Sequence, residues 1–196
     1  MANICDTTYK ITGTRKAVIE LWNAIRMFDV DSMNVRLSKL AEYFGIDWKN
    51  RHICVRGSIY FAEYECDEAA DYYVLTIETE TAWSACNQLF ETINKEILSG
   101  ELSISYREIE CGCDIYCVHD EGSFFEEECC VSSSGEPFED ACDDIYDTID
   151  DAINEWCEKM NFDRGGRTRE DMMEYIDGYE YDNPDTYFCI HPFEFE

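Results

Sequence analysis

The sequence predicts an α+β protein built on an antiparallel sheet that carries its helices on one face. Segments in which apolar and polar residues alternate, as in half-buried strands, take turns with segments of helical apolar spacing. A hydrophobic content of 45% and an aromatic content of 14% supply a core for these elements. This composition is typical of a globular chain and excludes a disordered acidic tail. No apolar run in the sequence approaches the roughly 20 residues of a membrane span.

The chain is expected to begin with a strand and two helices. Residues 4–12 (ICDTTYKIT) alternate as a strand, and Thr14 is placed to cap a helix over residues 15–28. A short helix is expected at residues 37–44, and Gly45 ends it.

A hairpin, a helix and a strand are expected next. Residues 52–65 read as a long strand with a bulge at Gly57, paired with a strand over residues 71–79. Thr81 then caps a helix over residues 83–98, and the alternating stretch LSISYREIE forms the last strand of this half. The resulting order is the βαββαβ plan of the ferredoxin-like fold, an antiparallel sheet with its helices on one face.

The second half is expected to add a hairpin, an acidic helix and a final strand. The stretch CDIYCVHDEGSFFEEECCVSS reads as a hairpin that turns near Gly122. Glu139 to Met160 has an apolar stripe at helical spacing, which predicts one docked amphipathic helix. A short helix at Arg169 to Tyr175 and a strand over residues 186–196 close the chain. Together these elements form an acidic β-hairpin/helix extension.

The two halves of the chain differ strongly in charge. The net charge is −29. Residues 1–107 hold 16 acidic and 11 basic residues, whereas residues 108–196 hold 28 and 4. We therefore expect a ferredoxin-like core at residues 1–110 and an acidic extension at residues 111–196, packed on the core as one globular unit. A negative field of this strength repels nucleic acid and anionic membranes and attracts basic partners.

Four short motifs carry a resemblance to a known family. They are the opening ICDTTYKITG, the strand CVRGSIYF, the helix entry TETAW and the segment EIECGCDIY with its DEGSFF turn. With these motifs the chain resembles the YubB-type ferredoxin-like proteins of bacterial plasmids, phages and other mobile elements. The resemblance implies a ferredoxin-like domain and a mobile-element origin, and it transfers no catalytic residue. Small acidic proteins that interfere with host nucleic-acid enzymes are common on such elements.

The acidic helix suggests a function. Like charges three or four residues apart on a helix repel one another, and Glu139 to Met160 carries nine acidic residues and a single lysine. A rigid row of carboxylates can occupy the basic groove that binds DNA in another protein. We therefore predict a non-enzymatic nucleic-acid mimic that inhibits or sequesters a basic, nucleic-acid-binding host protein, as an anti-defence factor. The residues predicted to bind this partner are Asp143, Asp144, Asp147, Asp150, Asp151, Glu155, Glu126, Glu127 and Glu128.

Two alternatives remain open. The acidic surface can serve solubility alone, in a domain of purely structural role. The chain can also bind zinc, because each of the three His has a Cys two positions away and alternate residues of a strand share a face. Cys117, His119 and Cys113 are the first candidate ligands. Cysteine is abundant throughout, however, and no C-x-x-C pair occurs, so we expect no bound metal and no other cofactor.

The sequence offers little support for an enzyme. It contains no G-x-S-x-G elbow, no P-loop and no G-x-G-x-x-G fingerprint. The N-terminus lacks the pattern of a signal peptide, and several of the twelve cysteines fall on apolar faces. We therefore expect free thiols in a reducing cytoplasm, that of a bacterial host.

Overall fold

The computed structural model is an α+β protein with a large sheet, a small sheet and five α-helices among the residues that it describes, which are 3–28, 34–139, 141 and 144–195. The chain divides into two compact units. Unit 1 comprises residues Met1–Phe124 together with Phe195–Glu196, and unit 2 comprises Phe125–Glu194. In the described part of the chain, no helix is both long and apolar enough to cross a lipid bilayer.

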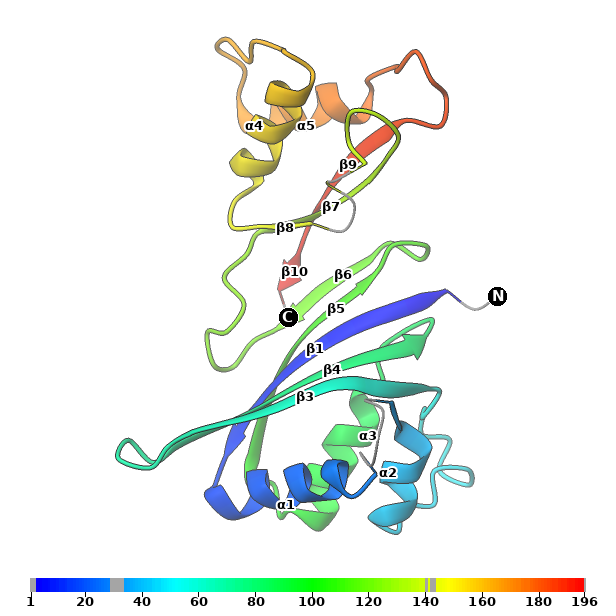
Figure 1. Cartoon of the computed structure of the whole chain (residues 1–196), viewed down its shortest axis with the longest axis vertical. Coiled ribbons are helices and arrows are strands. Elements are labelled where there is room, and N and C mark those ends of the chain that lie inside the picture. The colour runs from blue at the N-terminus through cyan, green and yellow to red at the C-terminus, as the bar shows by residue number, and fades with distance from the viewer. Residues whose placement is uncertain (1–2, 29–33, 140, 142–143, 196) are drawn as a thin grey trace. The chain divides into compact units, whose positions relative to one another are not determined.

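Unit 1 is a seven-stranded sheet with its helices on one face (Figure 1). The strand order is β10-β6-β5-β1-β4-β3-β2, and the long strands are paired antiparallel. Its elements are β1 (Ile4–Gly13), α1 (Arg15–Arg26), β2 (Val35–Arg36), α2 (Leu37–Tyr43), β3 (Gly57–Asp67), β4 (Tyr72–Ala82), α3 (Asn87–Thr92), the π-helical turn η1 (Ile93–Ile97), β5 (Leu102–Glu110), β6 (Ile115–His119) and β10 (Glu194–Phe195), which begins at the last residue of unit 2.

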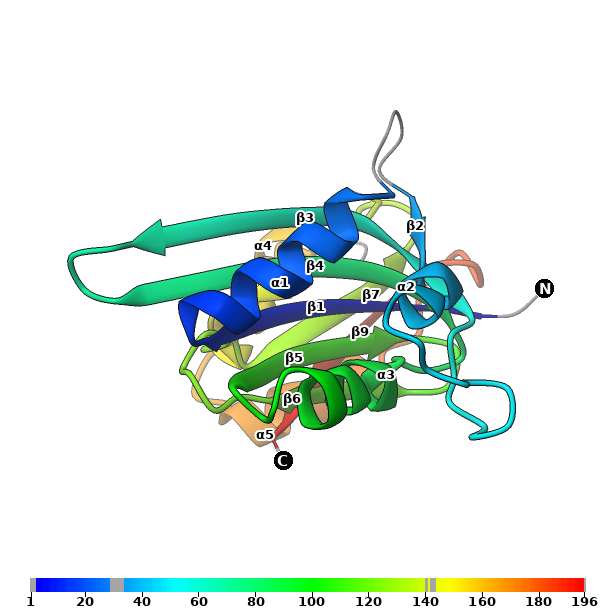
Figure 2. The same ribbon diagram turned by 90° about the horizontal axis from the view of Figure 1, so that it is seen from below.

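Alternation along β1 places the core of unit 1 between the sheet and its helices. Cys5, Tyr9 and Ile11 are fully buried on the face that the helices cover. Thr14 caps α1 as expected, since its hydroxyl accepts a hydrogen bond from the amide of Ala17 at 3.3 Å. Figure 2 shows α1 and α3 lying across the same face of the central strands. Burial of this apolar face accounts for α1 being where the sequence predicts it.

The expected hairpin is present, but its bulge lies at a different residue. β3 and β4 pair antiparallel, and their register shifts between Ile59 and Phe61, so the extra residue is Tyr60 and not Gly57. Gly57 serves another purpose: a Cβ there would lie 2.3 Å from the carbonyl oxygen of Glu80. The glycine is needed for the close approach of two backbones.

The second long helix of unit 1 begins later than expected. Thr81 is not its cap, because Thr81 lies within β4 and its hydroxyl donates to the carbonyl oxygen of Ser84 at 2.8 Å. Trp83 has a positive φ of 76°, which ends the extended chain. The helix starts at Asn87 and loosens into η1 at Ile93.

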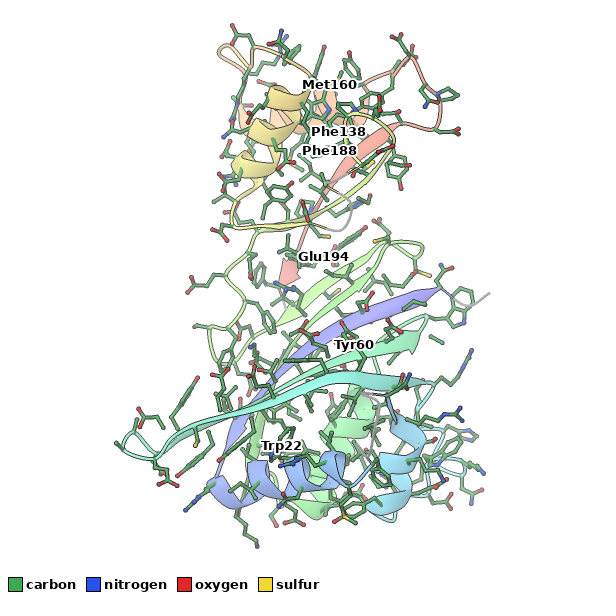
Figure 3. All side chains as sticks on the ribbon, viewed as in Figure 1. Trp22, Tyr60, Phe138, Met160, Phe188 and Glu194 are labelled. Atoms are coloured by element: carbon green, nitrogen blue, oxygen red, sulfur yellow. The ribbon has the colours of Figure 1, made fainter. Side chains whose placement is uncertain are left out.

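Unit 2 has its own sheet and its own core. Its elements are β7 (Cys129–Ser134), β8 (Ile145–Tyr146), α4 (Ile149–Lys159), α5 (Arg169–Asp177) and β9 (Tyr187–Pro192), and the strand order is β8-β7-β9. Trp156, Phe138 and Phe188 are almost completely buried. Figure 3 shows Phe138 beside Phe188, with ring centroids 4.9 Å apart. The indole nitrogen of Trp156 donates to the hydroxyl of Tyr181 at 2.8 Å.

Two expectations about the strands of the second half are wrong. Residues 113–133 do not form a hairpin, because β6 pairs with β5 in the large sheet whereas β7 pairs with β8 and β9 in the small one. The carboxylate of Asp120 instead holds a turn, by accepting from the amides of Gly122 and Phe124. The boundary between the two compact units falls after Phe124. The final strand is divided between β9 and β10.

The acidic helix is also shorter than expected. It begins at Ile149, and the hydroxyl of Thr148 caps it by accepting from the amide of Asp151 at 3.1 Å. Ile145 falls inside the segment that was expected to be helical, but it lies in β8 and pairs with Cys130. Among the described residues of the predicted segment before Met160, the eleven from Ile149 to Lys159 are helical. The short helix expected near Arg169 is confirmed as α5.

Candidate functional site

Unit 2 carries most of the negative charge of the chain. It holds 22 acidic and 4 basic residues, a net charge of −18 in 70 residues, whereas unit 1 holds 22 and 11 in 126. Each of the four basic side chains contacts groups of unit 2 itself. Arg167 lies over the rings of Phe162 and Tyr175, at 5.2 and 5.3 Å from their centroids. The other three pair with carboxylates.

Asp150 is the centre of an ion-pair network at the start of α4. Its carboxylate accepts from Arg164 at 2.7 Å and from Arg169 at 2.7 and 3.0 Å. Arg169 also pairs with Glu128 at 3.1 Å, and Glu128 accepts from the first amide of the helix, that of Ile149, at 2.9 Å. The hydrogen bonds from Arg169 and then Arg164 hold the pKa of Asp150 below its usual range.

This network corrects the expectation of unrelieved repulsion along the helix. Asp150 and Glu128 neutralise two arginines, and Glu155 accepts from the hydroxyl of Tyr146 at 2.7 Å and pairs with Lys159 at 3.5 Å. The side chain of Asp151 accepts from the capping hydroxyl of Thr148. Four of the nine residues predicted to bind a partner therefore have contacts that stabilise unit 2.

The other five predicted residues do not lie in one helical row. Glu126 and Glu127 precede β7 on the segment that leads into unit 2. Asp144 and Asp147 flank β8, where their backbone carbonyl oxygens accept hydrogen bonds from Val131 and Glu128. Asp143 lies outside the described residues. The carboxylates of Glu126, Asp144 and Asp147 are exposed, so the acidic surface is spread over loops and a short strand.

A second acidic row lies on α5. Glu170, Glu174 and Asp177 are exposed and are spaced by four and three residues, which places them on one side of the helix. The helix begins with a capping box between Thr168 and Asp171. The sequence predicts a short helix here, within the acidic second half of the chain. It did not show that the helix borders a groove.

That groove lies between α5 and β9. It has a volume of about 260 Å³ and is lined by Met173, Glu174, Ile176, Asp177, Cys189 and Ile190. Met173 and Ile190 pack against the core of unit 2, and Ile176 belongs to that core. The groove thus combines an apolar floor with two carboxylates. Such a combination suits a side chain with an apolar stem and a cationic end.

A larger, more polar groove lies in unit 1. It has a volume of about 360 Å³, and its lining residues are Asn87, Glu91, Asn94, Ile104, Tyr106, His119 and Glu121. The His119 ring stacks on Tyr106, and its Nε2 lies 3.8 Å from a carboxylate oxygen of Glu121. No serine or cysteine is among the lining residues, so the groove does not itself pair a nucleophile with a base.

The three Cys/His pairs are placed separately. Cys117 and His119 lie on β6 and share a face, whereas Cys113 lies in the turn before it and accepts from the Asn3 amide at 3.9 Å. Near His52, which has a positive φ of 55°, the Sγ of Cys54 lies 3.4 Å from that of Cys86. The Nε2 of His191 on β9 lies 2.7 Å from the hydroxyl of Ser132. Over residues 3–28, 34–139, 141 and 144–195, no three Cys, His, Asp or Glu side chains form a cluster that could hold a metal ion.

No family model, curated protein sequence or solved structure matches the chain. The resemblance to the YubB-type proteins therefore remains a prediction that depends on the short motifs of the sequence.

Proposed function

We propose that this chain is a non-enzymatic interaction protein whose unit 2 binds a basic protein and thereby competes with nucleic acid for it. The observation that carries the proposal is the charge of unit 2: a net −18, in which all four basic side chains are engaged with groups of the same unit. The charge that is left to face a partner is negative. A surface of this kind attracts a basic protein over a distance and repels DNA, RNA and anionic membranes.

We further propose that unit 1 is a ferredoxin-like frame for this acidic unit. In support, β5-β1-β4-β3 are antiparallel neighbours. The elements β1, α1, β3, β4, α3 and β5 have the βαββαβ order, with β2 and α2 inserted between α1 and β3. The motif resemblance agrees with this arrangement and favours a bacterial mobile element as the origin and a host cytoplasm as the place of action. The basic partner is then a nucleic-acid-binding protein of the host.

The proposal predicts that unit 2 displaces DNA from basic proteins. The assay uses the heparin-binding fraction of a bacterial lysate, labelled duplex DNA and a gel-shift readout, with the full chain as competitor. The test variant D147N/E158Q/E170Q/E180Q/D182N removes five charges from exposed residues of unit 2. The control variant E20Q/E63Q/E65Q/E80Q/E91Q removes five charges from exposed residues of unit 1.

The two variants separate a local acidic surface from net charge. We expect the parent chain and the unit 1 variant to release the DNA, and the unit 2 variant to need a clearly higher concentration. The competition should also weaken steeply with salt, because such attraction is screened over about 8 Å at physiological ionic strength. Equal potency of the two variants would show that the acids of unit 2 act only as a solvated surface.

A further inference from the structure

The groove between α5 and β9 is the one apolar recess of unit 2 described above that also carries acidic side chains. Its floor is formed by Met173, Ile176 and Ile190, and Glu174 and Asp177 line it from α5. A volume of about 260 Å³ leaves room for the stem of a long side chain. The floor does not depend on the partner for its shape, because its three apolar residues pack in or against the core of unit 2.

The two carboxylates of the groove are available to a ligand. Glu174 and Asp177 are exposed, and no ion pair or side-chain hydrogen bond engages either of them within the described residues. They differ in this respect from Asp150 and Glu128, which hold arginines of the same unit. Glu170 extends the row by one turn toward the start of α5.

We infer that this groove is the docking site for a lysine- or arginine-bearing segment of the basic partner. A lysine or arginine stem would lie on the apolar floor, and its cationic end would meet the carboxylates of Glu174 and Asp177. Charge complementarity selects this occupant, because the groove belongs to a unit with a net charge of −18. The inference rests on the proposed function and adds to it the place and chemistry of the contact.

The test measures the affinity of the full chain for a labelled hexa-arginine peptide at physiological salt, by fluorescence anisotropy. The groove variant is E174Q/D177N, and the charge-matched control is E180Q/D182N, which alters two exposed acids of the same unit outside the groove. We expect the groove variant to bind about tenfold more weakly and the control about twofold or less, since the two control carboxylates do not line the groove and act on the peptide only through the screened field.

A second variant tests the apolar floor. Met173→Gln keeps the length of the side chain and the charge of the protein but makes the floor polar. We expect it to weaken peptide binding severalfold while leaving the slope of affinity against salt unchanged, because no charge is lost. Hydrogen exchange of α5 in the free variant verifies that the helix remains folded.

The outcomes separate the groove from the acidic surface as a whole. Equal loss in E174Q/D177N and E180Q/D182N, together with full binding by Met173→Gln, overturns the groove and leaves the acidic interaction intact. Failure of the parent chain to bind the peptide overturns both. Tighter binding of a polyamine such as spermine than of the peptide, compared at equal concentrations of positive charge, would also overturn a protein segment as the occupant.

Discussion

The buried hydrogen bond between Trp156 and Tyr181 makes a sharp prediction about the stability of unit 2. Trp156 is fully buried, and its indole N–H donates to the Tyr181 hydroxyl at 2.8 Å. Tyr181→Phe keeps the ring and removes the acceptor. An indole N–H left without a partner in this core costs about 1–3 kcal/mol.

The matched control is the neighbouring residue Tyr179. Its ring contacts Trp156 edge to face, with 5.3 Å between the ring centroids. Among the described residues, the Tyr179 hydroxyl makes no hydrogen bond to Trp156. Tyr179→Phe should therefore change the free energy of unfolding by less than about 0.5 kcal/mol. For a unit of 70 residues, a loss of about 1.5 kcal/mol lowers the unfolding midpoint by roughly 6–12 °C.

The measurement must follow unit 2 separately from unit 1. Hydrogen exchange with mass spectrometry on the full chain, as a function of temperature, reports peptides of residues 125–194 and of the large sheet independently. We expect Tyr181→Phe to accelerate exchange in unit 2 alone. Equal exchange in the two Phe variants would refute the reasoning, because both retain their rings and only one of them loses the hydrogen bond.

Alkaline pH provides a second readout. Burial raises the pKa of Tyr181, and burial together with the hydrogen bond to Glu155 raises that of Tyr146. Because the folded pKa exceeds the value of about 10 for an exposed tyrosine, the unfolded state releases these protons first. The stability that depends on the protonated phenols is therefore complete below about pH 10 and is lost as the pH rises further. Tyr181→Phe should make this loss shallower.

Three further predictions concern the ion-pair network, the close strand contact and the thiols. Asp150→Asn should lower the unfolding midpoint of unit 2 more than Asp147→Asn does, because among the described residues Asp150 pairs with two arginines and Asp147 with none. In thermal melts this difference should shrink at 1 M NaCl, where the Debye length is about 3 Å. Equal midpoints for the two variants would show that the ion-pair network adds no stability. Gly57→Ala should destabilise unit 1 in urea unfolding by about 1–3 kcal/mol, since the new methyl group meets a backbone carbonyl oxygen, whereas unchanged stability would mean that the strands can move apart. In a thiol titration of the native protein, the exposed Cys66 should react quickly. The buried Cys129, whose pKa is raised by burial to about 12, should react only when the protein unfolds. Fast reaction of Cys129 would contradict its burial.

The elements of the first half of the chain can be predicted because they depend on residues that are close together in the sequence. Alternation in β1, the Thr14 cap of α1 and the hairpin between β3 and β4 each depend on residues near one another in the sequence. The errors there concern positions only. The bulge lies at Tyr60, and Gly57 is needed because the neighbouring strand passes close to it. The spacing of residues along a single strand does not reveal such a close approach.

The elements of the second half are harder to predict because its strands pair with strands far away in the sequence. The alternation in β6 and β7 fits many partners, and one of the two partners of β7 is β9, more than fifty residues further along the chain. The acids at Asp147 and Asp150 satisfy helical spacing, yet Thr148 lies between them as the cap of α4. The Thr148-x-x-Asp151 capping pattern was the local signal for that boundary.

The candidate surface was predictable in sign but not in geometry. Composition alone places the negative charge in the second half of the chain. It does not show that Arg164 and Arg169, 14 and 19 residues away from Asp150, converge on its carboxylate. The groove beside α5 likewise needs two elements that only the folded chain brings together.

The passage of the chain from β6 into unit 2 and back to β10 makes unit 2 an insertion. β6 and β10 are neighbouring strands of the large sheet, so the chain leaves and re-enters that sheet at adjacent positions. A module attached by two closely spaced ends can be exchanged for another without altering the strands that carry it. Exchange of the segment between residues 125 and 193 would then leave β6, β10 and the large sheet to which they belong unchanged.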